Sequence, residues 1–392
     1  MRARSVTRRY GPALVVPLML VAVLAGLRPG AASASTCGSG TAQPLRPGSS
    51  NSFFGVAVSS CHAWAVGDYA TGTGRLLTLI ERWNGTAWKR QPSPNPGSSY
   101  NTLTGVAATS ATNAWAVGQA SNDAASHAFQ TLAEHWNGAT WTRVPSPSPG
   151  GPTGNNELAG VAATSASNAW AVGAYDSAPG AAFQTLAEHW NGTAWSVVPT
   201  PDPGSTGNHL YGVDAVAPND VWAVGQRLGA QAPDQGLVEH WNGQKWSVVP
   251  SPVATSASVM LDAVTASHGE VWAAGEADSP ASGGRPIIVH RQGGHWQTAH
   301  LPASAGNNWT NLYGIAAAGG SVWAVGTFVD LKTDNNETLI LRGTGNHWTV
   351  DQGPNPGSGS NILGGLTAID GQLWAAGTFD DGGSALPLVE HR

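Results

Sequence analysis

Ala169-Trp170-Ala171-Val172-Gly173 is one copy of a pattern that returns along most of this chain. Seven copies of Trp-Ala-(Val/Ala)-Gly are present, and successive copies are 50 to 55 residues apart. Their tryptophans are Trp64, Trp115, Trp170, Trp222, Trp272, Trp323 and Trp374. Repeats of this length indicate small supersecondary units that bury their faces against one another. We therefore interpret the chain as seven tandem units.

A second pattern, Trp-Asn-Gly-x-x-Trp, follows the first one in four of the copies. Its tryptophan pairs are Trp83/Trp88, Trp136/Trp141, Trp190/Trp195 and Trp241/Trp246. In the fifth and sixth copies it decays to Arg291…Trp296 and Arg342…Trp348. Both patterns together hold 17 of the 18 tryptophans, and only Trp309 lies outside them. Because they recur in every unit, we assign these rings to the framework rather than to a carbohydrate-binding ladder.

The third unit shows how each copy divides into four short strands. Leu158–Ala163 is small and apolar, and Ala169–Gly173 alternates with a period of two. A long polar loop leads to a third strand, Thr185–Trp190. The fourth strand begins at Trp195 and ends at Pro199, since proline cannot donate a ladder hydrogen bond.

Asn191-Gly192 joins the third and fourth strands of this unit. Asn-Gly favours a two-residue type I′ turn, in which both central residues need positive φ. Such a turn places Trp190 opposite Thr193 and Glu188 opposite Trp195.

A four-stranded antiparallel unit of about 50 residues, repeated in tandem, predicts a propeller blade. One blade is too thin to bury its own faces, so the tryptophan rings must lie between blades, each covering roughly 150–250 Å². The sequence therefore predicts an all-β, seven-bladed β-propeller over residues 53–392. Its repeats start near residues 53, 103, 158, 210, 261, 312 and 362.

Residues 1–34 have the character of a signal peptide. They combine an arginine-rich start, an apolar run and the small-residue site Ala32-Ser33-Ala34. We expect a secreted, extracellular protein with no membrane insertion after cleavage. The removed segment carries five arginines and no acids, which leaves 13 basic and 24 acidic side chains and a net charge of −11. A chain without basic runs is not expected to bind nucleic acid, and we expect a monomer.

The seventh copy ends at Arg392, where its fourth strand should start. Residues 35–52 are predicted to supply the closing strand of blade seven, because 41–48 resemble the end of a fourth strand and its exit loop. Closure of this kind removes exposed edges. Cys37 and Cys61 are the two cysteines, and a pair in an exported chain favours one disulfide.

The repeats resemble those of kelch-type β-propellers and the central domain of galactose oxidase. The resemblance rests on the glycine closing each second strand, such as Gly173, and on paired aromatic residues around a turn, such as Trp136 and Trp141. Kelch repeats carry a glycine doublet, whereas a single glycine stands here. Galactose oxidase-like copper chemistry needs a Cys–Tyr pair and two converging histidines. Since both cysteines are N-terminal, the resemblance implies the fold and leaves that activity as an alternative.

Two polar features repeat around the predicted ring. Glu-His pairs occur at 134–135, 188–189, 239–240 and 390–391, and we expect them to face solvent and a neighbouring strand, too far apart to converge on one substrate. Acidic residues occur in every loop between the second and third strands. Carboxylates suit Ca²⁺, but ordinary solvated loop tips are the interpretation we favour, and neither a cofactor nor a metal site is assigned.

Trp309 is the candidate ligand-binding residue, flanked by Asn307 and Asn308 in a loop between blades five and six. An aromatic ring among amides can stack on a sugar and hydrogen-bond its hydroxyls, although the ring could equally cap the gap between the blades. Secondary contacts are expected from comparable loops. They are Tyr100, Asn155, Asn156, Asn208, His209 and Asn361.

The predicted function is a secreted, non-catalytic binding module that holds a protein or a glycan on the face with the longer loops. One alternative is an extracellular enzyme, galactose oxidase-like or hydrolytic, with its site at the mouth of the central channel. A second alternative is a structural propeller of the cell envelope without a small ligand. Fold class alone does not choose among them, and no catalytic residue is assigned.

Overall fold

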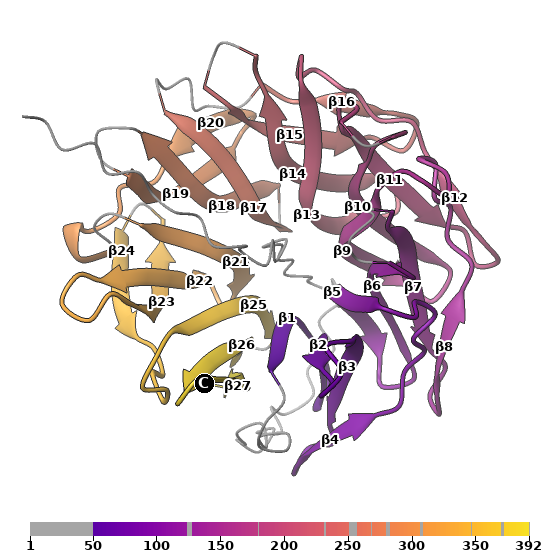
Figure 1. The fold of residues 1–392 in the computed structure, drawn as a ribbon. Coiled ribbons are helices and arrows are strands. Elements are labelled where there is room, and N and C mark those ends of the chain that lie inside the picture. The colour runs from indigo at the N-terminus through magenta and orange to yellow at the C-terminus, as the bar shows by residue number, and fades with distance from the viewer. Residues whose placement is uncertain are drawn as a thin grey trace, which may run out of the picture.

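The computed structural model describes residues 50–123, 128–178, 180–230, 233–250, 257–267, 269–279, 283–305, 309–345, 347–369 and 372–391. Over these residues the chain forms seven antiparallel sheets, arranged as blades around a central axis (Figure 1). Within the described residues six blades have four strands and blade seven has three, always paired in sequence order. The predicted all-β, seven-bladed propeller is confirmed.

The strands follow the repeat. The first strands are β1 (Asn51–Ser59), β5 (Tyr100–Ser110), β9 (Asn156–Ser165), β13 (Gly207–Ala217), β17 (Ser258–Ser267), β21 (Thr310–Ala318) and β25 (Asn361–Ile369). The second strands are β2 (His62–Ala70), β6 (Asn113–Ser121), β10 (Asn168–Tyr175), β14 (Asp220–Leu228), β18 (Glu270–Ser279), β22 (Ser321–Asp330) and β26 (Gln372–Asp381). The third strands are β3 (Leu76–Trp83), β7 (Gln130–Trp136), β11 (Gln184–Trp190), β15 (Gln235–Trp241), β19 (Gly283–Gln292), β23 (Asn335–Thr344) and β27 (Ser384–His391). The fourth strands are β4 (Trp88–Gln91), β8 (Trp141–Val144), β12 (Trp195–Val197), β16 (Trp246–Val248), β20 (His295–Thr298) and β24 (His347–Gln352), and a short 3-10 helix, η1 (Ala303–Ala305), follows β20.

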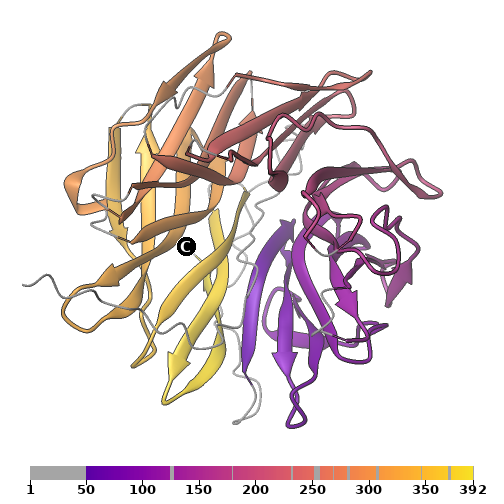
Figure 2. The same ribbon diagram turned by 45° about the horizontal axis from the view of Figure 1, so that its top comes forward.

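The first strands begin one to three residues before the predicted repeat starts, and they ring the centre (Figure 1). The two ends of the ring differ in their connections. We call the end with the second-to-third-strand loops and the links between blades the loop face. The opposite end, with the tight first-to-second and third-to-fourth turns, is the turn face. Figure 2 shows the ring tilted, with both sets of connections at its edges.

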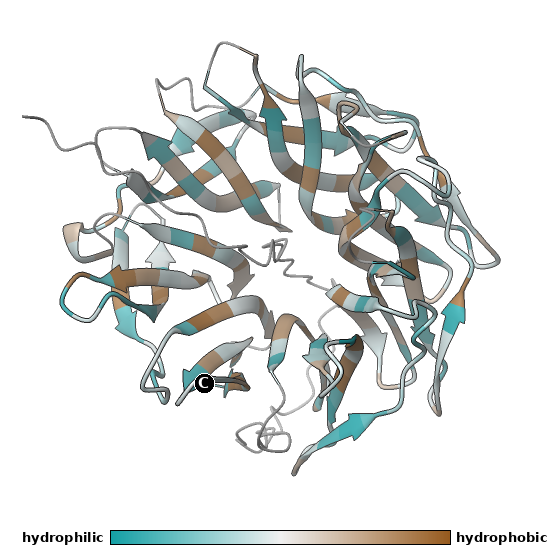
Figure 3. Cartoon of the chain, in the orientation of Figure 1, coloured by the Kyte–Doolittle hydropathy of each residue, from teal (hydrophilic) through white to brown (hydrophobic). Residues whose placement is uncertain are grey.

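Neighbouring blades are held together by indole rings, as predicted. Trp170 in β10 is almost fully buried, and its ring centroid lies 4.9 Å from that of Trp241 and 5.2 Å from that of Trp246, both in the next blade. Trp115 packs in the same way on Trp190 and Trp195, at 4.8 and 5.0 Å. Apolar residues run along the inner strands, whereas the outer strands β4 and β8 are largely hydrophilic (Figure 3). The tryptophan repeat is therefore a framework.

The glycine that ends each Trp-Ala-(Val/Ala)-Gly pattern is required for a steric reason. A Cβ on Gly173 would stand 1.9 Å from the carbonyl oxygen of Glu157 in the paired strand. The six equivalent glycines show the same approach, at 1.8 to 2.1 Å. Opposite each of them the first strand has a bulge that leaves one residue unpaired. Only glycine lets the second strand pass this point.

The predicted register of the Asn-Gly hairpin is wrong. Trp190 pairs with Trp195, and Glu188 pairs with Val197, so the loop has four residues rather than two. The carboxamide oxygen of Asn191 accepts hydrogen bonds from the backbone N–H groups of Thr193 and Ala194, at 2.9 and 3.0 Å. This side-chain turn replaces the type I′ turn and sets the two indole rings directly opposite each other, 5.9 Å apart.

The sixth repeat is also aligned differently from the prediction. Gly343, not Arg342, pairs with Trp348 and so takes the place that Trp83 has opposite Trp88. Arg342 pairs with Trp323 across the sheet and lies 4.9 Å from its ring. The third-strand residue that pairs with the fourth-strand tryptophan is thus itself tryptophan in blades one to four, Arg291 in blade five and Gly343 in blade six.

The ring closes between blades seven and one. Trp374 is fully buried and lies 6.2 Å from Trp83 and 6.1 Å from Trp88, and β1 lies beside β25 (Figure 1). The predicted signal peptide, most of the closing segment 35–52, and Cys37 lie outside the described residues. Cys61 lies partly buried in the turn between β1 and β2. The closing strand and the disulfide therefore stay predictions.

Candidate functional site

Trp309 is the most exposed aromatic side chain on the loop face. It precedes β21, and 49% of its surface is open to solvent. Its φ is +71°, and its backbone N–H donates to the carbonyl oxygen of Gly284 in blade five at 2.8 Å. A bulky residue in this left-handed conformation is uncommon and is held by its surroundings. The backbone thus fixes an outward-facing indole between blades five and six. Asn307 and Asn308 lie outside the described residues.

Glu276 in β18 lies beneath this loop. A Cβ on Gly284 would stand 2.9 Å from a carboxylate oxygen of Glu276 and 3.9 Å from the Cα atom of Trp309, so Gly284 leaves room for both. Burial raises the pKa of Glu276 to about 6, and the nearby charge of Asp278 adds to the shift. A carboxyl group with this pKa exchanges its proton near neutral pH.

The strands that ring the centre carry further titratable side chains. Tyr211, Asp262 and Tyr313 are the bulged residues of β13, β17 and β21, and all three are buried. Neither carboxylate oxygen of Asp262 has a hydrogen-bond partner among the described residues, and its burial raises its pKa well above the usual value. Burial raises the pKa of both tyrosines, and the nearby charge of Asp262 adds to the shift. With Glu276 these residues form what we call the mouth cluster.

Sequence reasoning missed the mouth cluster. Tyr211, Asp262 and Tyr313 stand at the bulged position of the first strand, and Glu276 follows Gly275 in the second strand. At the bulged position the other blades carry Phe54, Thr104, Ala159 and Gly364. In every copy the bulged residue lies between a leucine or phenylalanine and a small residue, and its own identity changes from blade to blade. That variation was the signal that could have marked the site. Because the bulge cannot be seen in the alternation, the pattern did not show which way that residue faces.

Of the predicted secondary contacts, Tyr100 and His209 lie on the first strands of blades two and four. Tyr100 is half-buried and makes an edge contact with Phe129, 5.1 Å away. The ring of His209 packs against that of Phe183, with centroids 4.6 Å apart and planes tilted by 36°, and its Nδ1 atom lies 3.6 Å from Glu157. Both stand at or near the start of first strands, which ring the centre, rather than on the outer strands (Figure 1).

Asn156 is fully buried and ties the loop face together. Its carboxamide oxygen accepts a 2.6 Å hydrogen bond from the N–H of Gly150, and its Nδ2 atom donates to the carbonyl oxygen of Phe129 at 3.0 Å. We call this the asparagine clasp, and it recurs as Asn101 with Gly97, Asn208 with Gly204 and Asn361 with Gly357. In blade five its position is occupied by Val259. The side chain of Asn156 is thus engaged within the protein, whereas Asn155 pairs with Asp176 at 2.8 Å.

In three of the four Glu-His pairs the glutamate does not face solvent, contrary to the expectation, whereas Glu390 of the fourth pair is partly exposed. Glu134, Glu188 and Glu239 are fully buried, because the third strand is covered by the neighbouring blade. Glu188 accepts a 2.8 Å hydrogen bond from Ser146 of the preceding blade. Burial raises the pKa of Glu188 to about 8 and that of Glu239 to about 9. The carboxyl groups are interior components of the blade interfaces.

The histidine after each of these glutamates packs against the tryptophan of the second strand. His135 lies 4.5 Å from Trp115, and His189 lies 4.6 Å from Trp170. Burial lowers the pKa of both histidines. Among the described residues no three His, Cys, Asp or Glu side chains gather to hold a metal ion, so a Ca²⁺ site stays a possibility raised by composition alone.

Comparison with known proteins supports the architecture. No protein-family profile and no curated protein sequence matches the chain. In the described part of the chain no helix has the length and apolar character needed to cross a bilayer. A solved structure described as YCF48 bound to D1 peptide is similar over 88% of this chain and 94% of its own, with a TM-score of 0.51 and 14% identity. The WD40 β-propeller domain of Doa1 matches over 89% and 95%, with a TM-score of 0.50 and 10% identity.

At these identities the likeness shows the fold alone. The chain is a β-propeller, and its resemblance to the kelch type stays a prediction.

Proposed function

We propose that this protein is an exported, non-catalytic binding module that holds a polypeptide on its loop face, with Trp309 as the anchor. The proposal rests on one observation: the side chain of Trp309 is exposed to solvent, while its backbone N–H is held by a hydrogen bond to the carbonyl oxygen of Gly284. Large exposed aromatic rings are enriched among the residues that dominate binding energy at interfaces. Export is supported by the composition of residues 1–34.

Further features of blade six favour a polypeptide. Leu331, in the β22–β23 turn at the same end of the blade, is 64% exposed. In the sequence Asp330 precedes it, and Lys332 and Asp334 follow it. An exposed apolar side chain among charges of both signs matches a polypeptide segment that carries apolar and charged side chains. One of the similar propellers, YCF48, is described as bound to a peptide, which is in keeping with this use of the fold.

The test is capture of proteins from the extracellular fraction of the native cells, using residues 35–392 as bait. Trp309→Ala is compared with Val216→Ala, which removes an exposed apolar side chain near the turn face. A partner lost with Trp309→Ala and retained with Val216→Ala supports the proposal. A partner that Trp309→Ala retains contradicts it. A glycan array run with the same samples detects the alternative that Trp309 stacks on a sugar.

An enzyme at the channel mouth is the second candidate, and the mouth cluster is the observation in its favour. Two carboxyl groups with raised pKa, Asp262 and Glu276, influence the same tyrosine, Tyr313. Shifted values of this kind concentrate at catalytic sites but also occur in structural clusters. Turnover of a hydrolase substrate panel that falls at least a hundredfold in Glu276→Gln, with the fold intact, would favour this candidate.

A further inference from the structure

A carboxylate lies next to the exposed indole residue of the loop face. The backbone N–H of Trp309 donates to Gly284, and a Cβ on Gly284 would stand 2.9 Å from a carboxylate oxygen of Glu276 and 3.9 Å from the Cα atom of Trp309. Because Gly284 has no side chain, the carboxylate and the indole residue share one small space. The side chain of Trp309 is 49% exposed, and that of Glu276 is partly exposed. A ligand on the loop face therefore has access to both.

The carboxylate of Glu276 has no partner in the described part of the chain. None of the hydrogen bonds or ion pairs there involves its oxygens. Arg285 lies in the paired strand, but it is adjacent to Pro286, which pairs with Glu276. Since successive side chains of a strand point to opposite faces, Arg285 projects from the other face of the sheet. A cation that binds at Glu276 must therefore come from outside this group of strands.

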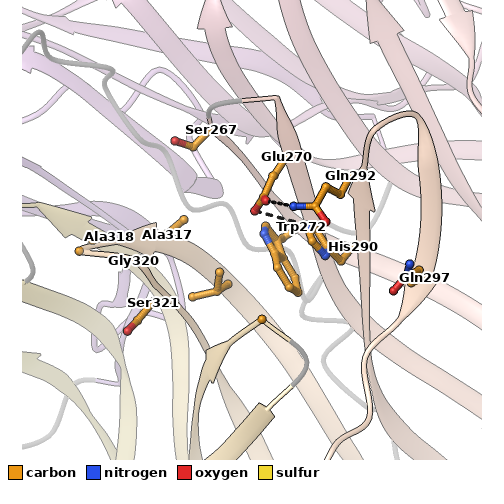
Figure 4. A pocket seen from close by; sticks show the side chains of 13 residues that line it. Ser267, Glu270, Trp272, His290, Gln292, Gln297, Ala317, Ala318, Gly320 and Ser321 are labelled. Carbon is orange, nitrogen blue, oxygen red and sulfur yellow. Dashed lines mark hydrogen bonds and ion pairs between the residues drawn. The ribbon is translucent and has the colours of Figure 1, made fainter.

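The acid at the opposite end of the same strand provides a contrast. Glu270 begins β18 at the turn face, and one of its oxygens lies 3.4 Å from the Nε2 atom of His290. Its other oxygen accepts a hydrogen bond from Gln292 (Figure 4). Glu270 is thus engaged within the protein, whereas Glu276 leaves its oxygens available to a ligand.

The neighbours of Glu276 supply further acceptor oxygens and no cation. Asp262 is fully buried, and neither of its carboxylate oxygens has a hydrogen-bond partner among the described residues. The buried carboxamide oxygen of Asn311 is likewise unpartnered there. Besides burial, both carboxylates and the carboxamide act on the pKa of Tyr313, so the three groups lie around one phenol ring. Acceptors gathered in this way favour a cationic donor.

The repeat places a similar pair between blades one and two. Tyr100 stands at the position of Trp309, three residues before the leucine that pairs with the close-approach glycine. Asp68, like Glu276, directly follows the corresponding glycine of the preceding blade. Here, however, Asp68 is buried and Tyr100 is half-buried against Phe129. The acid–aromatic pair is thus closed between blades one and two and open between blades five and six.

We infer that the loop face binds a lysine side chain of its polypeptide partner, with the lysine stem along the indole of Trp309 and the ammonium group on the carboxylate of Glu276. This inference rests on the function proposed above and specifies which side chain of the partner is recognised. An indole attracts a cation and packs against an apolar stem. Lysine fits better than arginine because one oxygen of Glu276 faces Gly284. A guanidinium fork needs both oxygens open, whereas an ammonium group needs one.

The test is titration of residues 35–392 with the peptide acetyl-Gly-Leu-Lys-Leu-Gly-amide, followed by calorimetry and ligand-observed NMR. At pH 7.5 Glu276 is mainly ionised, since its pKa is about 6. Peptides with arginine or Nε-acetyl-lysine at the centre are the comparisons. The lysine peptide should bind most tightly, and the uncharged acetyl-lysine peptide about tenfold more weakly. Absence of lysine-peptide binding to the folded wild type, or equal binding of either comparison peptide, would overturn the inference.

Three variants assign the effect to the acid–aromatic pair. Glu276→Gln should weaken the lysine peptide by about tenfold and leave the acetyl-lysine peptide unchanged. Glu270→Gln is the matched control, because it removes the same charge from the other end of the strand and should leave every titration unchanged. Trp309→Ala alters an exposed side chain and should also weaken the lysine peptide. Unchanged lysine binding in folded Glu276→Gln or Trp309→Ala, or an equal loss in Glu270→Gln, would overturn the inference.

Capture from the extracellular fraction separates this inference from the function on which it rests. The fraction is divided, and the lysines of one half are acetylated with acetic anhydride before capture. A partner that depends on Trp309 and is lost on acetylation agrees with both proposals. A partner that depends on Trp309 but is retained after acetylation overturns the lysine assignment and leaves the binding function intact. If no captured partner depends on Trp309, the binding function fails, and the peptide titrations alone decide whether the lysine site exists.

Discussion

Trp374, in the last blade, lies 6.2 Å from Trp83 in the first, and no described strand of one blade is shared with the other. Side-chain packing therefore contributes much of the closure of the ring. We expect Trp374→Ala to lower the free energy of unfolding by about 3–5 kcal/mol, the usual range for a deleted core aromatic residue. Denaturant titration measures this value. A loss no larger than that of the exposed-site control Trp309→Ala would show that the indole contributes little to closure.

The predicted closing strand is tested separately. Removing residues 35–48 should lower the melting temperature of the mature chain, because blade seven would keep one open edge. Differential scanning calorimetry of the two chains measures the shift. An unchanged melt would show that this segment does not contribute to blade seven.

Burial of the interface glutamates predicts a pH dependence. The pKa of Glu188 is raised to about 8 in the folded protein, above its value in the unfolded chain. Folding stability from this group is therefore full below about pH 4.5 and decreases as the pH rises to about 8. Glu188→Gln, which mimics the protonated acid, should flatten this decrease.

Denaturant midpoints at pH 5 and pH 8 measure that effect. The midpoint of the wild type should fall more than that of the variant between these two values. Parallel decreases in the two proteins would indicate that Glu188 is ionised in the folded state.

The glycines that close the second strands are predicted to be strictly required. Gly173→Ala places a methyl group 1.9 Å from a backbone oxygen, so the paired strands must separate, and a loss of about 2–4 kcal/mol is expected. Gly72→Ala is the matched control, because nothing lies within 4 Å of its added carbon. Thermal unfolding of both variants checks this, and similar melts would contradict the steric explanation.

Substitution of a buried clasp asparagine is expected to lower the stability of the fold and to leave partner binding unchanged. Asn156→Ala leaves the N–H of Gly150 and the carbonyl oxygen of Phe129 without their partner, which should cost about 1–3 kcal/mol. The folded fraction should retain the partner that Trp309→Ala loses. Loss of the partner at unchanged stability would instead place Asn156 in the binding surface.

The periodic part of the sequence predicted the architecture well. The nearly constant spacing of Trp-Ala-(Val/Ala)-Gly indicated seven blades. It also assigned the indole rings to the interfaces between blades, because the flat face of a sheet is buried by large apolar rings that recur at the same position in each blade. The register errors came from turn chemistry. The side chain of Asn191 completes the loop that glycine alone was expected to form, and Gly343 is displaced by one residue from the pattern.

The candidate site was harder to predict, because its residues depend on departures from the pattern. Asp262 is buried at a bulge that alternation does not reveal, and Glu188 is buried because a neighbouring blade covers its strand. Trp309 was found because it stands outside both repeats. A single aromatic residue that symmetry does not explain was the informative signal.

The replacement of the clasp asparagine by Val259 has a consequence for how the molecule can diversify. Blades one to three are nearly interchangeable copies, whereas blades four to six contain Val259, Arg291, Gly343, Trp309 and the mouth cluster. The departures from the repeat named here are therefore concentrated in three neighbouring blades, all of which keep four strands in sequence order. The blade scaffold tolerates these exchanges, so this sector can acquire chemistry that the repeat does not provide without loss of the fold.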